Sequence, residues 1–290
     1  MGVIRSKISL FISQIISDKV YLSIKFRTRM GYWMKWNQPK TFCEKIQVLK
    51  LRSKRHPEFT KMVDKVDAKN FVSGIIGDEF IIPTLGVWDK FEDIDFNQLH
   101  GDFILKCTHD SSKGVVFREG EHKNLEQVRK RMEYYQARTY FDQNREYPYK
   151  NVPHRIIAER FLINGDDAEL TDYKFYCFNG DAKYVQLIAD RNSKETIDFY
   201  DRDWIHQPFC GLNPQAENAL TEHKAPNNYK EMFILADTLA KHIDTPFVRI
   251  DLYNVNGRIY FGEITFFPST GIGKFRPSEW DLKLGEMIFL

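Results

Sequence analysis

Alternating apolar and polar residues along most of the chain predict β-hairpins separated by helices. We predict strands at residues 80–82, 103–107, 115–117, 154–162, 172–178, 183–189, 247–253 and 259–265. Apolar residues recur at helical spacing around residues 44–51 and over residues 58–75, 123–142 and 228–242. Hairpins that alternate with helices indicate an α+β fold with mainly antiparallel sheets. A doubly wound dinucleotide-binding fold is disfavoured, because no G-x-G-x-x-G sequence follows a predicted strand.

Turn residues set the ends of several predicted strands. Asn179-Gly180 stands between two apolar alternations, which is a strong hairpin signal, and residues 254–257 form a similar turn before the last strand. Pro83 is expected to stop the strand at residues 80–82, because proline has no backbone N–H to donate. The polar residues around Pro57 mark the first boundary in the chain.

The N-terminal part of the chain is strongly basic. Residues 1–55 contain 13 Lys or Arg residues against two acidic residues and carry +11, which leaves −9 on the other 235 residues of a chain whose net charge is +2. This asymmetry predicts either a polyanionic partner or a solvated basic face. Apolar residues over 4–16 also recur at helical spacing, which predicts an amphipathic helix that packs on the body or lies on a membrane surface.

The remaining composition excludes several classes of protein. No 18-residue apolar stretch could span a bilayer, and Met1 to Ile24 lacks a small-residue cleavage site. We therefore expect a cytoplasmic protein, with peripheral contact to anionic membrane through residues 1–35 as one role for the basic segment. Four widely spaced cysteines without a C-x-x-C pair indicate reduced thiols and no structural zinc. No nucleic-acid-binding motif accompanies the basic charge, so nucleic acid is not an expected partner.

Two carboxylates on the last predicted hairpin are the sharpest chemical signal. Arg249 and Asp251 fall on one face of their strand, and Glu263 and Thr265 fall on one face of the next strand. If the turn pairs these strands, Asp251 and Glu263 can meet, and a divalent cation would relieve their repulsion. The alternative is a pair of solvent-facing acids on an edge hairpin.

Lysines and a small polar loop form a second group. Lys106 ends a predicted strand before the loop Ser111-Ser112-Lys113-Gly114, and such a loop can present backbone N–H groups to phosphate. Lys174 stands among aromatic residues, where an ammonium group must reach solvent or an anion. Lys65, on a predicted helix, reads most simply as a surface lysine.

These residues occur in the order and context of a known family. The chain resembles the ATP-grasp superfamily, in the branch similar to teichuronopeptide-biosynthesis proteins, from about Lys45 to the C-terminus. The matching motifs are Asp64-Lys65, residues 77–83, residues 103–106 with the loop 111–114, Ile157-Ala158-Glu159, residues 172–175, Arg249-Ile250-Asp251 and residues 262–271.

The resemblance implies a fold in which two α+β units clamp ATP. It assigns Lys65, Lys106 and Lys174 to the phosphates, the loop Ser111, Ser112, Lys113 and Gly114 to closure over them, and Glu159 to the ribose end. It assigns Asp251, Glu263 and Thr265 to Mg²⁺, and Thr265 stands where most of the superfamily has Asn. Arg249, facing the acyl centre, and Lys174 are the expected catalytic residues.

The same resemblance gives a domain division. We expect a basic helical segment at 1–56, an α/β part at 57–100, a small ATP-grasp subdomain with the phosphate loop at 101–162, and a C-terminal subdomain with the metal site at 163–290.

The implied activity is an ATP- and Mg²⁺-dependent carboxylate–amine ligase with an acylphosphate intermediate. Family association places it in bacterial surface polysaccharide (capsule) synthesis, joining an amino acid or amine to a carboxyl group such as a uronic acid. The alternative is a glycosyltransferase of that pathway, in which Asp93-Ile94-Asp95 or Asp201-Arg202-Asp203 holds a metal and a sugar nucleotide. A third possibility is a non-enzymatic binder that docks through the basic segment.

Overall fold

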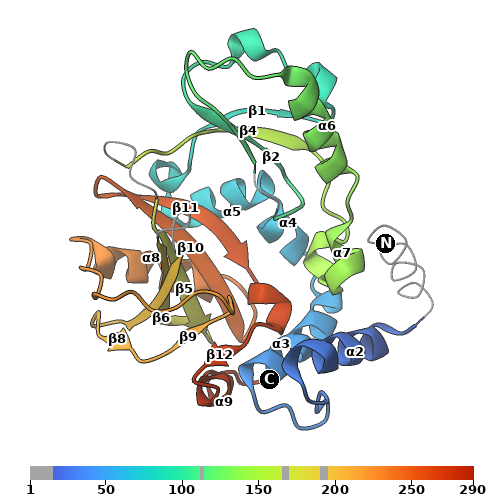
Figure 1. Cartoon of the computed structure of the whole chain (residues 1–290), viewed down its shortest axis with the longest axis vertical. Coiled ribbons are helices and arrows are strands. Elements are labelled where there is room, and N and C mark those ends of the chain that lie inside the picture. Colours follow the sequence, from blue (N-terminus) through green and yellow to red (C-terminus); the bar gives the residue numbers. More distant parts are fainter. Residues whose placement is uncertain (1–15, 112–113, 165–169, 190–194) are drawn as a thin grey trace.

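Two antiparallel sheets of different size form the framework of the molecule (Figure 1). The computed structural model describes residues 16–111, 114–164, 170–189 and 195–290. The N-terminal amphipathic helix expected over residues 4–16 lies almost entirely outside the described residues. None of the described helices combines the length and the hydrophobicity that a bilayer-spanning helix needs. The α+β class with mainly antiparallel sheets is confirmed.

The smaller sheet, at the top of Figure 1, has the strand order β1-β4-β2-β3. Its strands are β1 (Thr84–Trp88), β2 (Phe103–Cys107), β3 (Val115–Phe117) and β4 (Ile156–Arg160). Alternate residues of β2 are buried, as the alternation in the sequence predicts. Helix α6 (Leu125–Gln136) contributes Val128 and Met132 to the core of this sheet, which is separate from the main core.

The larger sheet has the strand order β11-β10-β5-β6-β7-β8. Its strands are β5 (Asp172–Phe178), β6 (Asp181–Ala189), β7 (Thr196–Asp201), β8 (His206–Gln207), β10 (Phe247–Val255) and β11 (Arg258–Thr265). The hairpin turns Asn179-Gly180 and Asn256-Gly257 have positive φ at both residues, as the tightest antiparallel turns require. A short ladder of β9 (Cys210–Gly211) and β12 (Phe275–Arg276) lies beside it.

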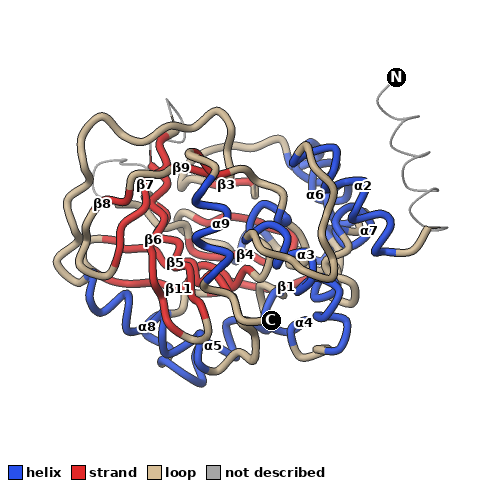
Figure 2. Tube along the Cα trace, turned by 90° about the horizontal axis from the view of Figure 1, so that it is seen from below, coloured by secondary structure: helices blue, strands red, loops and turns tan. Residues whose placement is uncertain are grey.

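Different helices cover the two faces of the larger sheet (Figure 2). Phe175 of β5 packs against Phe233 of α8 (Tyr229–Lys241) with ring centroids 4.9 Å apart. Its neighbour Tyr176 points to the other face and packs against Phe42 of α3 (Phe42–Arg52) at 6.2 Å. Helix α9 (Glu279–Glu286) packs beside α3 on that face. Even-numbered residues of β5, including Lys174, therefore share the face of α3.

Short helices connect the two sheets. Helices α4 (Phe59–Val63) and α5 (Asp67–Ile76) contact β11, while the basic helix α2 (Asp18–Met30) lies near α3 and α7 (Tyr140–Asn144). Helix α3 begins with a capping box, in which Thr41 and Glu44 satisfy each other's backbone N–H groups.

The prediction of a strand at residues 80–82 is wrong. Residues 78–80 form a 3-10 turn, and the strand begins after Pro83, at Thr84. Proline can precede a strand because its missing N–H costs no ladder bond there, and its carbonyl accepts a bond of 3.0 Å from the N–H of Arg160.

Two predicted helices are interrupted, and strands β7, β8, β9 and β12 were not predicted. The helix at 58–75 breaks at Asp64, whose backbone is extended and whose carboxylate accepts a 2.8 Å bond from the N–H of Val66. The helix at 123–142 divides into α6 and α7. The longest of these strands, β7, has the sequence Thr-Ile-Asp-Phe-Tyr-Asp, in which two aspartates interrupt the apolar pattern. The other predicted strands and the helix at 228–242 are confirmed.

Gly285 should be intolerant of any side chain, because α9 approaches the start of α3 closely at this residue. A Cβ there would overlap the carbonyl oxygen of Lys40 and lie 2.6 Å from the backbone nitrogen of Phe42. We expect Gly285→Ala to lower the free energy of unfolding by about 1–3 kcal/mol, measured by urea denaturation.

Gly74 on α5 is the matched control, because no atom would lie within 4 Å of a Cβ added at this residue. Gly74→Ala should stabilise the fold by about 0.5–1 kcal/mol, since alanine restricts the unfolded chain and favours the helix. Equal effects of the two substitutions would contradict the close approach of α9 and α3.

Candidate active site

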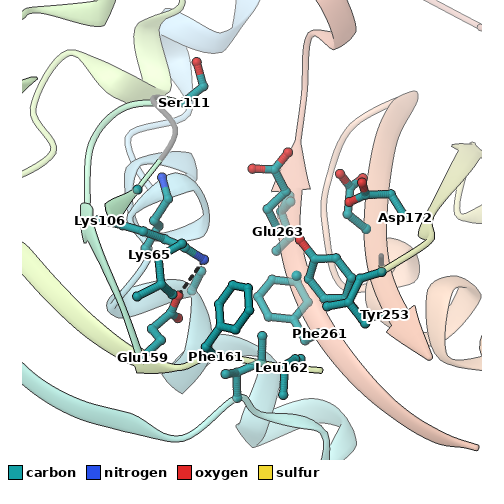
Figure 3. Close-up of a pocket in the computed structure, with 18 of the residues that line it drawn as sticks. Lys65, Lys106, Ser111, Glu159, Phe161, Leu162, Asp172, Tyr253, Phe261 and Glu263 are labelled. Atoms are coloured by element: carbon teal, nitrogen blue, oxygen red, sulfur yellow. Dashed lines mark hydrogen bonds and ion pairs between the residues drawn. The ribbon is translucent and has the colours of Figure 1, made fainter. Parts of the chain in front are cut away.

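A cleft of about 620 Å³ lies between the two sheets. Residues of the small sheet and of α4 and α5 line one side, and residues of β5, β10 and β11 line the other. Figure 3 shows Lys65, Lys106 and Glu159 on the first side, facing Glu263 and Asp172 on the second. The predicted lysine group and the predicted acid group are thus brought together around one cavity.

The two predicted carboxylates meet across the β10–β11 ladder. Asp251 is directly opposite Glu263, and Arg249 is directly opposite Thr265. The register shifts just after Asp251, where Gly262 brings its Cα close to the carbonyl of Asp251, and an added Cβ would lie 3.0 Å from that oxygen. Alternation in the sequence therefore predicted the correct faces for all four side chains.

Cations surround this acid pair. Arg249 donates from Nε to Oδ1 of Asp251 at 2.6 Å, and from a terminal nitrogen to Glu263 and to the Thr265 hydroxyl, both at 3.0 Å. Lys174 donates to Oδ2 of Asp251 and lies 3.6 Å from Asp172. Two cations thus balance three carboxylates, which leaves one negative charge on the cluster.

The two carboxylates differ in their environment. Asp251 is 2% exposed, and burial raises its pKa even though Arg249 and Lys174 oppose that shift. The side chain of Glu263 is 46% exposed towards the cleft. Desolvation disfavours its charge, but Lys174, Arg249 and Lys65 outweigh this and lower the pKa of Glu263 to about 2. Glu263 is therefore the charged carboxylate that the cleft presents to a ligand.

On the opposite side, Glu159 joins two lysines. Its carboxylate lies 2.8 Å from Nζ of Lys106 and 2.5 Å from Nζ of Lys69. Burial raises the pKa of Glu159, but the two ammonium groups together outweigh it and lower that pKa to about 2. Lys69 also donates to the carbonyl of Ile82 and the hydroxyl of Thr84, both at 2.8 Å. Lys69 is thus fully engaged, whereas Lys106 also lines the cleft.

Lys65 reaches the loop between β2 and β3. Its ammonium group donates to the backbone carbonyl of Asp110, and its backbone N–H donates to the carbonyl of Thr108 at 3.2 Å. Desolvation lowers the pKa of Lys65, although Glu263 across the cleft favours its charge. Lys65 is therefore a cleft residue, and the interpretation as a surface lysine is wrong.

The described residues of the predicted phosphate loop border the same cleft. Ser111 and Gly114 line it, whereas Ser112 and Lys113 lie outside the described residues. Gly114 passes close to β2, and a Cβ there would lie 2.6 Å from the carbonyl of Leu105. Only glycine allows the loop to rejoin the sheet at this distance.

The other end of the cleft is apolar. After β4 the chain continues as Phe161-Leu162-Ile163, and these side chains line the cleft with Phe261 and Ile104 (Figure 3). A flat aromatic base fits such a surface better than a charged group does.

Several residues in the cleft or directly behind it were not identified from the sequence. Lys69 follows Ala68 on the buried face of α5, and a lysine on an apolar face is a signal for a buried ion pair. Asp172 precedes Lys174 by two residues on β5, so strand alternation places both side chains on one face. No feature of the sequence predicts that the apolar wall at residues 161–163 lines the cleft.

A strained loop follows β11 directly. In the turn η6 (Pro268–Gly271), Ser269 and Thr270 have φ of 45° and 53°, which are unfavourable for residues with a Cβ. Lys50 of α3 donates to the carbonyl of Thr270 at 2.6 Å, and Gln47 donates to the carbonyl of Gly271 at 2.8 Å. Buried side chains of α3 therefore fix the backbone of this loop.

The two Asp-x-Asp pairs have structural roles in turns. Asp95 accepts a bond of 3.0 Å from the N–H of Asn97, and Asp201 accepts one of 2.9 Å from the N–H of Ile205. Neither pair is among the residues that line the cleft.

The acid pair supplies ligands suited to magnesium. Among the described residues there is no group of three or more His, Cys, Asp or Glu side chains able to hold a metal by themselves. Mg²⁺ characteristically takes one or two carboxylates and completes its shell with phosphate oxygens and water. Asp251 and Glu263 fit that mode as two paired carboxylates that line the cleft, and the Thr265 hydroxyl lies 3.1 Å from Glu263.

Two lobes of antiparallel sheet that enclose a cleft, with lysines on one side and an acid pair on the other, define the ATP-grasp class of fold. The model of the TupA-like ATP-grasp family matches residues 44–289. The chain belongs to this family. The resemblance found in the sequence is thereby confirmed.

Solved structures of similar fold share little sequence with the chain. D-alanine–D-alanine ligase from Bacillus anthracis complexed with ATP aligns over 78% of this chain and 63% of its own, with 14% identity and a TM-score of 0.45. The ATP-grasp ligase PsnB with minimal precursor, Mg and ADP aligns over 72% and 52%, with 11% identity and a TM-score of 0.39. An L-amino acid ligase from Bacillus licheniformis aligns over 73% and 42%, with 11% identity and a TM-score of 0.40.

The chain thus spans less than two thirds of the length of these structures. No curated protein matches it.

Glu159→Gln should destabilise the fold in a pH-dependent manner. The substitution leaves Lys69 and Lys106 without a counter-charge, so we expect a loss of about 3 kcal/mol at pH 7. The native pKa of Glu159 is about 2 against an ordinary value of 4.5, so its stabilisation is complete above pH 4.5. The gap between wild type and variant in urea unfolding should shrink as the pH falls from 4.5 towards 2.

Glu126→Gln on α6 is the matched control, since the ion pairs of Glu126 with Arg129 and Lys130 are exposed. It should leave the free energy of unfolding nearly unchanged. A gap for Glu159→Gln that stays constant down to pH 2 would contradict the buried ion pairs.

Proposed function

We propose that this protein is an ATP- and Mg²⁺-dependent ligase that joins a carboxylate to an amine through an acylphosphate. The observation that carries the proposal is the cleft itself, where Lys65 and Lys106 face the Asp251–Glu263 pair. A polyphosphate is the ligand whose charge matches lysines on one side and a metal-binding acid pair on the other. Family membership supports the same activity.

The cleft would orient the nucleotide in one direction. The apolar wall at residues 161–163 suits the adenine ring, and Glu159, at the boundary with the lysines, suits the ribose. Lys65, Lys106 and Lys174 would neutralise the phosphates, and the loop at residues 111–114 would exclude water once closed. Bound Mg²⁺ would supply a positive charge that polarises the terminal phosphate for attack.

The reaction requires no side-chain nucleophile. A carboxylate oxygen of the substrate attacks the γ-phosphorus of ATP, the bond to the bridging oxygen of ADP breaks, and an acylphosphate forms. The amine nitrogen then attacks the acyl carbon, phosphate leaves, and the amine gives up a proton. Arg249 holds a permanent positive charge beside the acid pair, where it would stabilise the tetrahedral oxyanion, with Lys174 next to it.

The carboxylate that we propose belongs to a surface polysaccharide or its precursor, such as a uronic acid, and the amine is an amino acid. The family resemblance supports this choice, and ATP as substrate implies a cytoplasmic reaction. A sugar-nucleotide glycosyltransferase is less well supported, because both Asp-x-Asp pairs cap turns away from the cleft.

Release of ADP, screened over uronic acids crossed with amino acids in the presence of Mg²⁺, tests the proposal. We expect turnover only when both substrates are present, and we expect Glu263→Gln to reduce kcat at least about a hundredfold because it removes a carboxylate charge at the metal. The circular dichroism spectrum and melting temperature should remain close to those of the wild type, since the two side chains have equal volume. A fully active Glu263→Gln protein, or thermal protection by UDP-sugars and not by ATP, would refute the assignment.

Lys106→Met should weaken nucleotide binding while keeping the apolar stem. A charged hydrogen bond to phosphate is lost, so the Kd for ATP should rise by about tenfold to a hundredfold in titration calorimetry. Lys61→Met on α4 is the control, because this exposed lysine does not line the cleft. Unchanged affinity in Lys106→Met would remove this lysine from the phosphate site.

A further inference from the structure

The outer face of α2 and the loop after it expose apolar side chains. Val20 and Ile24 lie one turn apart and are 48% and 50% exposed, and Trp33 is 60% exposed. Apolar side chains that remain in contact with water contribute little to the stability of the fold. Three of the large exposed apolar residues in the described part of the chain thus fall within one short stretch, at residues 20–33.

Basic side chains are exposed in the same stretch of the chain. They belong to Lys19, Arg27, Arg29 and Lys35. The sequence from residue 19 to residue 43 contains no Asp or Glu. The two acids that flank this stretch are both engaged: Asp18 lies 2.9 Å from Arg145, and the buried Glu44 accepts bonds from the backbone N–H groups of Lys35 and Lys40 at 3.3 and 2.8 Å. We call residues 19–35 the basic apolar patch.

The patch belongs to the folded body. Leu22 and Phe26, on the opposite face of α2, are 1% and 0% exposed. Tyr21 and Lys25 donate to the carbonyl of Gln143 at 2.9 and 2.6 Å, which fixes the helix against α7.

The loop after α2 is fixed as well. The indole N–H of Trp36 donates to the hydroxyl of Ser23 at 2.8 Å, and Nζ of Lys19 lies over the Trp36 ring. The loop that carries Trp33 is therefore held against α2, while the Trp33 side chain itself remains exposed.

We infer that the basic apolar patch docks on an anionic lipid bilayer. Isoleucine and valine can enter the acyl boundary, tryptophan prefers the headgroup level, and arginine and lysine pair with anionic headgroups. A nucleic acid would satisfy the charges but would leave Val20 and Ile24 in water. A hydrophobic protein surface would cover the apolar residues but would not explain the absence of any acid between residues 19 and 43. The bilayer satisfies both observations, and this inference stands independently of the ligase activity.

Sedimentation of the full-length protein with vesicles tests this inference. Vesicles of phosphatidylcholine with about 30% phosphatidylglycerol are compared with vesicles of phosphatidylcholine alone, because anionic lipid gives the surface the negative potential that attracts basic residues. We expect binding to the anionic vesicles only, falling steeply between low and high salt.

Matched variants separate the patch from general surface effects. Ile24→Asp with Trp33→Asp should weaken vesicle binding about tenfold or more, because two insertions are lost and negative charge is added. Ile234→Asp with Ile205→Asp is the control, since these residues are each 60% exposed and lie elsewhere. Arg27→Gln with Arg29→Gln should reduce binding, and Lys130→Gln with Lys241→Gln should do so less.

The outcome also distinguishes the patch from the preceding segment. Deletion of residues 1–15 should leave anionic-vesicle binding that Ile24→Asp with Trp33→Asp still weakens. Equal binding by the patch variant and its control, binding to neutral vesicles as strong as to anionic ones, or no pelleting at all would overturn the inference. All these positions are exposed, so melting temperatures should stay within a few degrees of the wild type and verify folding.

Discussion

The buried charge balance around Asp251 is the interaction on which the candidate site depends. A carboxylate in this position is stable only because Arg249 and Lys174 contact it from two directions. Removing either cation would leave a buried charge without compensation, which costs far more than an exposed ion pair contributes. The same two cations lower the pKa of Glu263, so the charge that the cleft presents to a ligand depends on them as well.

The fold explains why this cluster faces the second group of charges. Strands β5, β10 and β11 are neighbours in the larger sheet, so Lys174, Asp251 and Glu263 come from three adjacent strands and lie in one row. Helix α3 covers the same face further along the sheet, at Tyr176, and the row of charges lines the cleft that the smaller sheet borders. Lys106 and Glu159 are paired on neighbouring strands of that smaller sheet. Each half of the site is thus rigid within its own sheet, and the cleft between them receives the ligand.

The sequence predicted those parts of the site that follow from local periodicity. Alternation along a strand determines which residues share a face, so Asp251 and Glu263 could be placed opposite each other once their hairpin was recognised. Lys65 lies in the turn between α4 and α5 and carried no such signal, because its hydrogen bond to Asp110 and its attraction to Glu263 depend on how distant segments pack around that turn. Lys69 was missed for the same reason, since its partner Glu159 is distant in the chain. The strand at Thr84 was misplaced because proline ends a strand and precedes one equally well.

Because α3 supports the η6 loop, the chain cannot be shortened past α3 without affecting the site. Lys50 and Gln47 come from the N-terminal basic part of the sequence, yet they hold the backbone that follows Glu263 and Thr265. Lys50 also lies 3.8 Å from the buried Glu146, beside α7. A truncated protein that begins after α3 would therefore lose the support of the loop and the cation beside Glu146. Helix α3 is therefore a structural part of the lobes that enclose the cleft, and shortened versions for expression should begin ahead of it.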